Sequence, residues 1–173
     1  MDAAISSSRQ ALESRALRKV LVVYYSRTGT TKKVAETIAQ ALGCDVEEVI
    51  DTKDRSGLIG WLRSGRDAAS RKLTTIEKTK NRPETYDVVV IGTPVWNGKA
   101  STPIMTYVSQ YKDLFKEVAF FCTHDGSGEG ALRDLETLCG KKPLATLALR
   151  RKQEVATGEY VGKAKRFASK VAG

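Results

Sequence analysis

Two patterns of hydrophobic and polar positions alternate along the chain, and they predict strands and helices in turn. Continuous apolar runs at 20–25, 87–91 and 118–122 are typical of strands that are covered on both faces. Residues 45–50 mix polar and apolar side chains, as an edge strand does, and 144–149 alternate and complete the set. Helical spacing of apolar residues predicts helices within 34–42, 57–69, 103–111, 131–139 and 160–171.

Five strands that alternate with helices predict one parallel sheet with right-handed crossovers. The common solution is a doubly wound, three-layer α/β/α sandwich of strand order 2-1-3-4-5, with the ligand outside the carboxyl ends of the first, third and fourth strands. We expect residues 20–173 to form this domain and 1–19 to be an N-terminal extension, either a short helix or a loose tail. The helix at 57–69 is expected to cover the sheet, and an overhang above the ligand is the alternative.

The loop after the first strand is built from groups that donate hydrogen bonds to an anion. Backbone N–H groups at a helix start lack partners and lie at the positive end of the helix dipole, so a phosphate suits this position. No P-loop or dinucleotide motif is present, which favours a mononucleotide. Hydroxyl groups, one charge and one glycine make up the loop: Ser26, Arg27, Thr28, Gly29, Thr30 and Thr31. The alternative is an ordinary helix cap.

Two more loops rich in glycine and polar residues follow the third and fourth strands, at 92–100 and 123–130. Trp96 lies in the first of these, without a helical or alternating pattern that would bury it, so it suits stacking on a planar ligand. Trp61 has Leu58 and Leu62 as helical neighbours and is the better candidate for core packing. One loop for a phosphate and two for a flat ring predict a flavin mononucleotide (FMN) site.

Residues 20–170 resemble the flavodoxin-like family. Residues 26–31 match its [ST]-x-T-G-x-T phosphate loop, and 92–98 look like its second flavin loop. The resemblance implies that Thr93, Pro94 and Val95 line the ribityl chain and ring edge, that Trp96 packs on or beside the ring, and that Asn97 or Gly98 offers a backbone group near N5. It also implies that the fourth-strand loop contacts the pyrimidine end through Thr123, His124, Asp125 and Gly126.

Two departures from electron-carrying flavodoxins concern charge and the fourth-strand loop. Such carriers are typically acidic and often have a second aromatic residue in that loop, whereas here it contains His124 and Asp125, so one flavin face could be open. His124 is the one histidine of the chain and a candidate for moving a proton to the ring or to a quinone; a solvated loop residue is the alternative. Pairing with Asp125 would stabilise its protonated form.

The net charge of +9 is concentrated in two segments, with a surplus of four Lys and Arg at 51–85 and of seven at 141–173. Either these are solvated surfaces or they bind an acidic partner. The three cysteines are widely spaced without a C-x-x-C pattern, so we expect no metal cluster, no disulfide framework and a cytoplasmic location. The longest apolar run is too short to span a membrane.

Three functions remain open. The first is an FMN protein that carries electrons between redox partners, with an acidic ferredoxin or reductase docking on the basic face. The second is an FMN-dependent NAD(P)H:quinone or nitro-compound oxidoreductase. The third and weakest is a non-enzymatic basic module on the same fold; we expect no nucleic-acid partner, since no aromatic-studded basic motif is present. The sequence contains no recognisable nicotinamide site, which favours the carrier.

Overall fold

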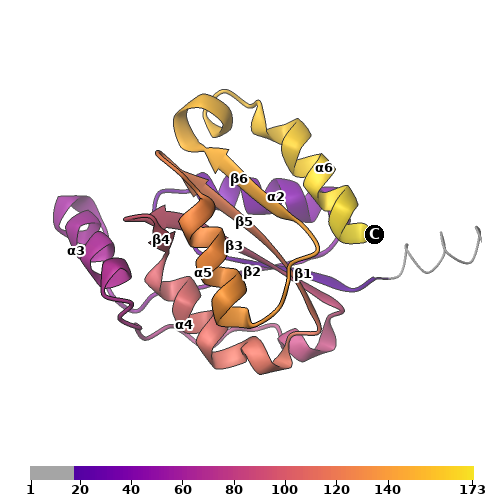
Figure 1. Ribbon diagram of the computed structural model, residues 1–173, viewed down its shortest axis with the longest axis horizontal. Coiled ribbons are helices and arrows are strands. Elements are labelled where there is room, and N and C mark those ends of the chain that lie inside the picture. The colour runs from indigo at the N-terminus through magenta and orange to yellow at the C-terminus, as the bar shows by residue number, and fades with distance from the viewer. Residues whose placement is uncertain (1–17) are drawn as a thin grey trace, which may run out of the picture.

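The computed structural model describes residues 18–173, so the predicted extension at 1–19 lies almost wholly outside the described residues. A parallel sheet has the order β2-β1-β3-β5-β6, which confirms the predicted 2-1-3-4-5 arrangement (Figure 1). A further two-residue strand, β4, pairs antiparallel with the end of β3. The strands are β1 (Val20–Tyr24), β2 (Asp45–Glu48), β3 (Val88–Trp96), β4 (Lys99–Ala100), β5 (Glu117–His124) and β6 (Thr146–Arg150).

Helices cover both faces of the sheet, giving the predicted three-layer sandwich. On one side lie α2 (Thr30–Leu42) and α6 (Tyr160–Ala172), and on the other α4 (Thr102–Tyr111) and α5 (Glu129–Cys139). A fifth helix, α3 (Gly57–Ala69), stands apart from these at the left edge of Figure 1. Short helical turns occur at Pro83–Thr85, Lys112–Leu114 and Arg151–Val155. Between residues 18 and 173, no helix combines the length and apolar character needed to cross a bilayer.

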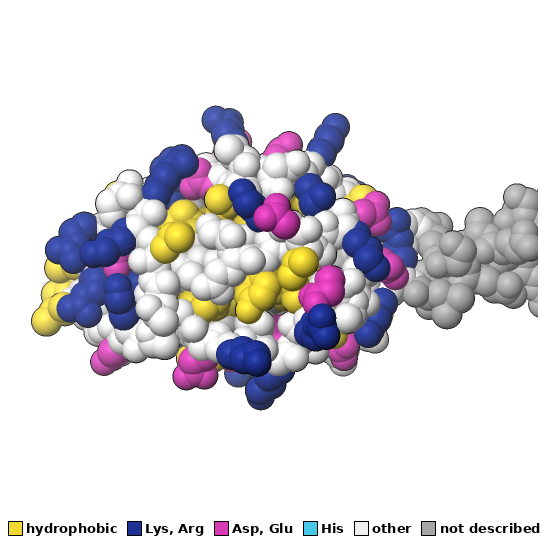
Figure 2. All heavy atoms as spheres, turned by 90° about the horizontal axis from the view of Figure 1, so that it is seen from below, with side chains coloured by type: hydrophobic (Ala, Val, Ile, Leu, Met, Phe, Trp, Pro, Cys, Tyr) yellow, Lys and Arg dark blue, Asp and Glu magenta, His cyan; other side chains and the backbone are white. Residues whose placement is uncertain are grey.

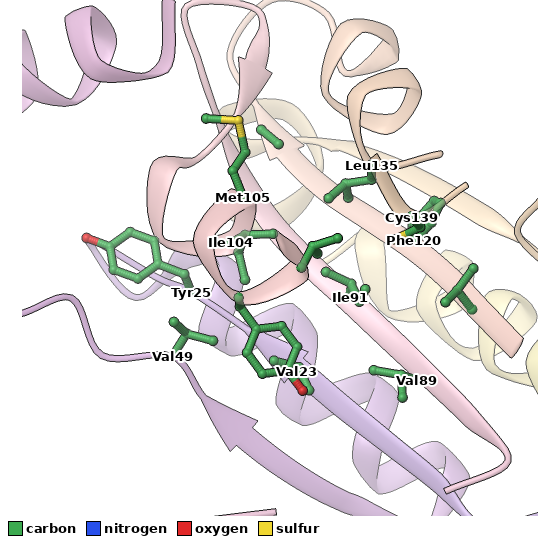
Figure 3. Packing of buried hydrophobic residues seen from close by; sticks show 14 of the residues in the cluster. Val23, Tyr25, Val49, Val89, Ile91, Ile104, Met105, Phe120, Leu135 and Cys139 are labelled. Atoms are coloured by element: carbon green, nitrogen blue, oxygen red, sulfur yellow. The ribbon is translucent and has the colours of Figure 1, made fainter. Parts of the chain in front are cut away.

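Successive residues of each central strand point to opposite faces, and both faces are buried. Val23, Ile91 and Phe120 point toward α4 and α5, where they meet Ile104 and Leu135 (Figure 3). Their neighbours along each strand, such as Val22, Val90 and Phe121, pack against α2 and α6 on the other side. This double coverage is why the central strands read as continuous apolar runs instead of alternating ones.

The third strand is longer than the sequence suggested. Residues 92–96, expected to be a loop, continue β3, because Val95 and Trp96 pair with Ala100 and Lys99. Asn97 and Gly98 form the two-residue turn between them, with φ angles of 49° and 73°. Positive φ at both central residues is the signature of a type I′ hairpin turn, for which Asn-Gly is the preferred sequence. The segment predicted to be the second flavin loop is therefore a β-hairpin. At the last strand, the structure begins β6 at Thr146 instead of residue 144.

Helix α3 does not cover the sheet, so the favoured expectation for it was wrong. Its inward face consists of Gly60, Ser64, Asp67 and Ala68, and of these only Ala68 belongs to a hydrophobic core cluster. These small side chains let the helix approach the rest of the domain closely, but they bury little apolar surface. The large apolar residues of α3 are exposed, and part of the helix lines the hollow, as the alternative expectation of an overhang requires.

Candidate functional site

A hollow with two adjoining compartments lies at the carboxyl ends of β1, β3 and β5. The first compartment, of about 120 Å³, lies over the first loop and the end of β5. The second, of about 520 Å³, lies over the β3–β4 hairpin and beneath α3. The first is lined by Ser26, Arg27, Thr28, Thr30, Thr31, Trp61, Pro94, Val95, Trp96, Thr123, His124, Asp125 and Arg151. The second is lined by Trp61, Leu62, Gly65, Arg66, Val95, Trp96, Asn97, Gly98, Asp125, Gly126 and Ser127.

The first compartment contains a helix start whose donors are left free. Gly29 precedes α2 with a φ of 89° and no side chain caps the helix; the first backbone bond runs from Lys33 N–H to the Gly29 carbonyl, at 3.0 Å. The preceding N–H groups therefore have no intrahelical acceptor. Ser26 Oγ accepts from the Gly29 N–H at 3.0 Å, which curls the loop around the helix end and leaves the hydroxyl proton of Ser26 for a ligand. Unpaired N–H donors at a helix start are the features that an anion site requires.

A buried pair of hydroxyl groups ties the first loop to β5. Thr31 Oγ1 and Thr123 Oγ1 are 2.8 Å apart, and the two residues are 1% and 4% exposed. One bond thus joins segments that are 92 positions apart in the chain. Because a buried hydroxyl without a partner is costly, this pair fixes the spacing between two walls of the compartment.

The two tryptophans have exchanged the environments that the sequence suggested. Trp96 is only 8% exposed and meets Tyr25 edge to face, with ring centroids 5.5 Å apart, although it still lines both compartments. Trp61, expected in the core, is 56% exposed and lines the same two compartments from α3. The side chain of Trp61 is exposed to solvent because small residues of α3 form the inward face of the helix. The hollow therefore has one fixed and one exposed tryptophan on its walls.

A buried ionic cluster lies behind the tryptophan of the hairpin. Arg55 is 3% exposed; its Nε donates to Asp51 at 2.5 Å and its Nη1 to Asp67 of α3 at 3.1 Å. Its guanidinium carbon lies 5.2 Å from the centroid of Trp96. Burial alone would lower the pKa of Arg55, but the hydrogen bonds and charges of the two carboxylates outweigh it and raise the pKa. Burial and the charge of Asp51 raise the pKa of Tyr25 to about 12.

His124 and Asp125 do not pair with each other. His124 is 9% exposed, not solvated, and within the described chain its Nδ1 is buried without a hydrogen-bond partner. Asp125 instead binds Arg151: Nε donates to Oδ1 at 3.0 Å and to Oδ2 at 3.2 Å, and Nη2 donates to Oδ2 at 2.9 Å. This bond raises the pKa of Arg151. The expected His–Asp pair is therefore corrected to an Asp–Arg pair, formed because the turn after β6 brings Arg151 to the same edge of the sheet.

Most predicted site residues line the hollow, and two do not: Gly29, which directly precedes α2, and Thr93. Thr93 is fully buried, lines neither compartment, and accepts a hydrogen bond at Oγ1 from the Ser101 N–H at 2.9 Å, which anchors the start of α4. The predicted set lacks Arg55 behind the hollow and six residues that line it: Trp61, Leu62, Gly65, Arg66, Ser127 and Arg151. The sequence does contain a signal that Trp61 is exposed: the small residues Gly60 and Ser64 indicate that another face of the helix packs against the domain. Within residues 18–173 no group of His, Cys, Asp or Glu is arranged to hold a metal ion.

Comparison with known proteins gives one family and several related folds. A family model described as flavodoxin matches residues 19–149. The chain is 28% identical to a flavoprotein from Lactobacillus acidophilus crystallised in complex with FMN, covering 81% of this chain and 97% of that one with a TM-score of 0.67. A candidate flavoprotein from Bacteroides uniformis is 24% identical over 88% and 98% of the two chains, with a TM-score of 0.72. Oxidised flavodoxin 2 from Bacillus cereus is 19% identical over 89% and 97%, with a TM-score of 0.55. No curated protein matches the sequence.

Proposed function

The chain belongs to the flavodoxin family, and we propose that it binds FMN and transfers electrons between redox partners. The observation that carries the proposal is the two-compartment hollow, in which an anion site adjoins a larger space between two tryptophans. FMN has the same two parts, a phosphate monoester and a flat ring system. The presence of FMN in the Lactobacillus acidophilus relative supports the same cofactor here.

The residues of the first compartment fit a phosphate. The free N–H groups at the start of α2 and the hydroxyls of Ser26, Thr28 and Thr30 are donors, and Arg27 adds a positive charge. Each hydrogen bond to a charged group contributes about 1.5–3 kcal/mol. This end of the hollow would hold the cofactor and fix its orientation.

The residues of the second compartment fit a planar ring. Val95 and Trp96 form its wall on the hairpin side, Asn97 and Gly98 offer backbone groups at the turn, and Trp61 lies on the side of α3. FMN supplies the electron-transfer chemistry when it is bound, and the protein supplies binding, orientation and electrostatics. An aromatic contact to the ring adds about 0.5–1.5 kcal/mol beyond the area that it buries. Arg66 on the wall would stabilise negative charge that the ring gains.

A spectrum and a titration of the purified protein test the cofactor. We expect flavin absorption or stoichiometric binding of added FMN, and much weaker binding of riboflavin, because riboflavin lacks the phosphate. Replacing the hydroxyls in Thr28→Val and Thr30→Val should weaken FMN binding while leaving riboflavin binding unchanged. Thr75→Val, at an exposed position outside the hollow, is the matched control. Absence of FMN binding, or equal affinity for FMN and riboflavin, would contradict the proposal.

A second candidate function is an FMN-dependent NAD(P)H:quinone or nitro-compound oxidoreductase. The observation that favours it is the apolar side of the second compartment, where Trp61 and Leu62 are exposed and a flat acceptor could lie against them. Steady consumption of NAD(P)H with a quinone would support the oxidoreductase. Reduction of the protein through a protein donor alone would support the carrier, whose partner we expect to be acidic because the chain is basic.

A further inference from the structure

Helix α3 has the reverse of the amphipathic arrangement that a helix of a globular protein normally has. Its large apolar residues are exposed, with exposed fractions of 72% for Leu58, 74% for Ile59, 56% for Trp61 and 58% for Leu62. A surface helix normally buries such residues and exposes polar ones. Within the described residues no other element exposes four large apolar side chains, so this outer face needs an explanation.

The orientation of α3 is fixed by its packing. A Cβ atom added at Gly60 would come within 2.2 Å of the backbone carbon and oxygen of Arg55, so only glycine fits on the inward face there. Asp67, on the same face, binds the buried guanidinium of Arg55. Turning the helix to bury its apolar side chains would break this ion pair and force a larger side chain into the place of Gly60. The apolar face is therefore held outward by the fold.

The exposed charge on this part of the surface is mainly positive, although the exposed carboxylate of Asp54 lies just before the helix, near Arg63. Arg63 and Arg66 are the solvent-exposed charges of α3, and its one acidic residue, Asp67, is buried against Arg55. Arg71 and Lys72, also exposed, follow the helix. Figure 2 shows hydrophobic side chains at the left end of the molecule beside a group of Lys and Arg side chains, at the end where α3 stands in Figure 1.

We propose that the outer face of α3 docks the protein on an anionic membrane surface. Leucine, isoleucine and tryptophan beside arginine are the composition of helices that lie in the bilayer interface, with the apolar side chains in the acyl boundary and the arginines at the lipid headgroups. A helix at one edge of the domain reaches such a surface without needing a partner of complementary shape. A second copy of the chain suits this face less well, because it would bring Arg63 and Arg66 of both copies together.

Docking in this way would place the hollow beside the bilayer, since Trp61 and Leu62 belong both to the outer face and to the second compartment. The electron acceptor or donor reached from that side would be a lipophilic molecule dissolved in the membrane. The docking itself depends only on residues of α3, so it can be tested whether or not FMN is bound.

Cosedimentation of the full-length protein with lipid vesicles tests the proposal. Vesicles of phosphatidylglycerol mixed with phosphatidylcholine should pellet the protein, and vesicles of phosphatidylcholine alone should not. Each basic residue near an anionic surface is worth about a fivefold change in partition, so Arg63→Gln/Arg66→Gln should reduce binding by roughly 30-fold. Leu58→Ser/Ile59→Ser should reduce it by at least about tenfold, because it removes the apolar contact.

Matched controls separate α3 from general effects of charge and exposure. Lys165→Gln/Arg166→Gln removes two exposed charges from α6, and Leu144→Ser removes an exposed leucine far from α3 in the sequence. Both should bind vesicles as the parent protein does, and circular dichroism should show that every variant is folded. The proposal is overturned if the parent protein does not bind anionic vesicles, or if the α6 pair weakens binding as much as the α3 pair. It is also overturned if Leu58→Ser/Ile59→Ser binds normally, or if that variant instead abolishes a dimer seen by light scattering.

Discussion

Replacing Arg55 by methionine should cost more stability than any other removal of a single charge among the described residues. The guanidinium lies between the carboxylates of Asp51 and Asp67, and the three side chains are only 1%, 2% and 6% exposed. Arg55→Met keeps an aliphatic chain beside Trp96 but leaves two buried carboxylates without a cation. Breaking a buried pair in this way costs about 3–5 kcal/mol. Loss of the contact with the Trp96 ring adds about 1 kcal/mol.

The matched control for this prediction is Arg71→Met. Arg71 binds Asp134 at 3.3 Å, but its side chain is 64% exposed, so its loss should cost less than about 1 kcal/mol. Urea unfolding followed by circular dichroism measures both changes. The triple variant Asp51→Asn/Arg55→Met/Asp67→Asn should recover much of the lost stability, because it removes the unpaired charges. Equal losses for Arg55→Met and Arg71→Met, or no recovery in the triple variant, would refute the reasoning.

Three further predictions concern a turn, a buried tyrosine and the exposed tryptophan. Gly29→Ala should destabilise the protein by about 1–2 kcal/mol in urea unfolding, because φ is 89° there and space for the methyl group is open; Gly126→Ala, with equal space and no positive φ, should be nearly neutral. Burial raises the pKa of Tyr25 to about 12, so the stability that its protonated form contributes is complete below pH ~10 and is lost as the pH rises through 12. Over this interval the free energy of unfolding of Tyr25→Phe should fall less than that of the parent protein, by up to about 2–3 kcal/mol. An identical fall in both proteins would contradict this prediction. Trp61→Ala should weaken FMN binding by roughly fivefold without loss of stability, whereas Leu58→Ala, whose side chain lines neither compartment, should not change it; no difference between the two in a titration would remove Trp61 from the site.

The sheet could be predicted because its signal is local to each strand. Runs such as 87–91 and 118–122 indicate burial on both faces, the polar residues of 45–50 indicate an edge, and the connection rules then leave one common order. The hairpin at the end of β3 has a local signal too, since Asn97-Gly98 between two extended segments is typical of a tight turn, whereas the glycine and polar residues of 92–100 alone predict an irregular loop.

The side chains behind the site could not be predicted, because their partners are distant in the sequence. Asp125 pairs with Arg151, 26 positions away, instead of with its neighbour His124. Arg55, just before α3, contacts Trp96 of the β3–β4 hairpin. Apolar spacing on the helix does not predict the exposure of Trp61, because Gly60 and Asp67 determine which face of α3 turns inward. Trp96 is buried but still lines the hollow. Local pattern placed the loops of the hollow, and packing between elements decided which side chains line it.

The hydrogen-bonded hydroxyls of Thr31 and Thr123 also constrain which groups in the hollow can donate and which can accept hydrogen bonds. Each hydroxyl has a single proton, so only one of the two can donate across their 2.8 Å contact. An anion that takes the proton of Thr31 obliges Thr123 to donate to Thr31, which leaves the oxygen of Thr123 as an acceptor on the wall that it shares with His124. Occupancy at the start of α2 would thus set the hydrogen-bond polarity at the end of β5, with no movement of the backbone.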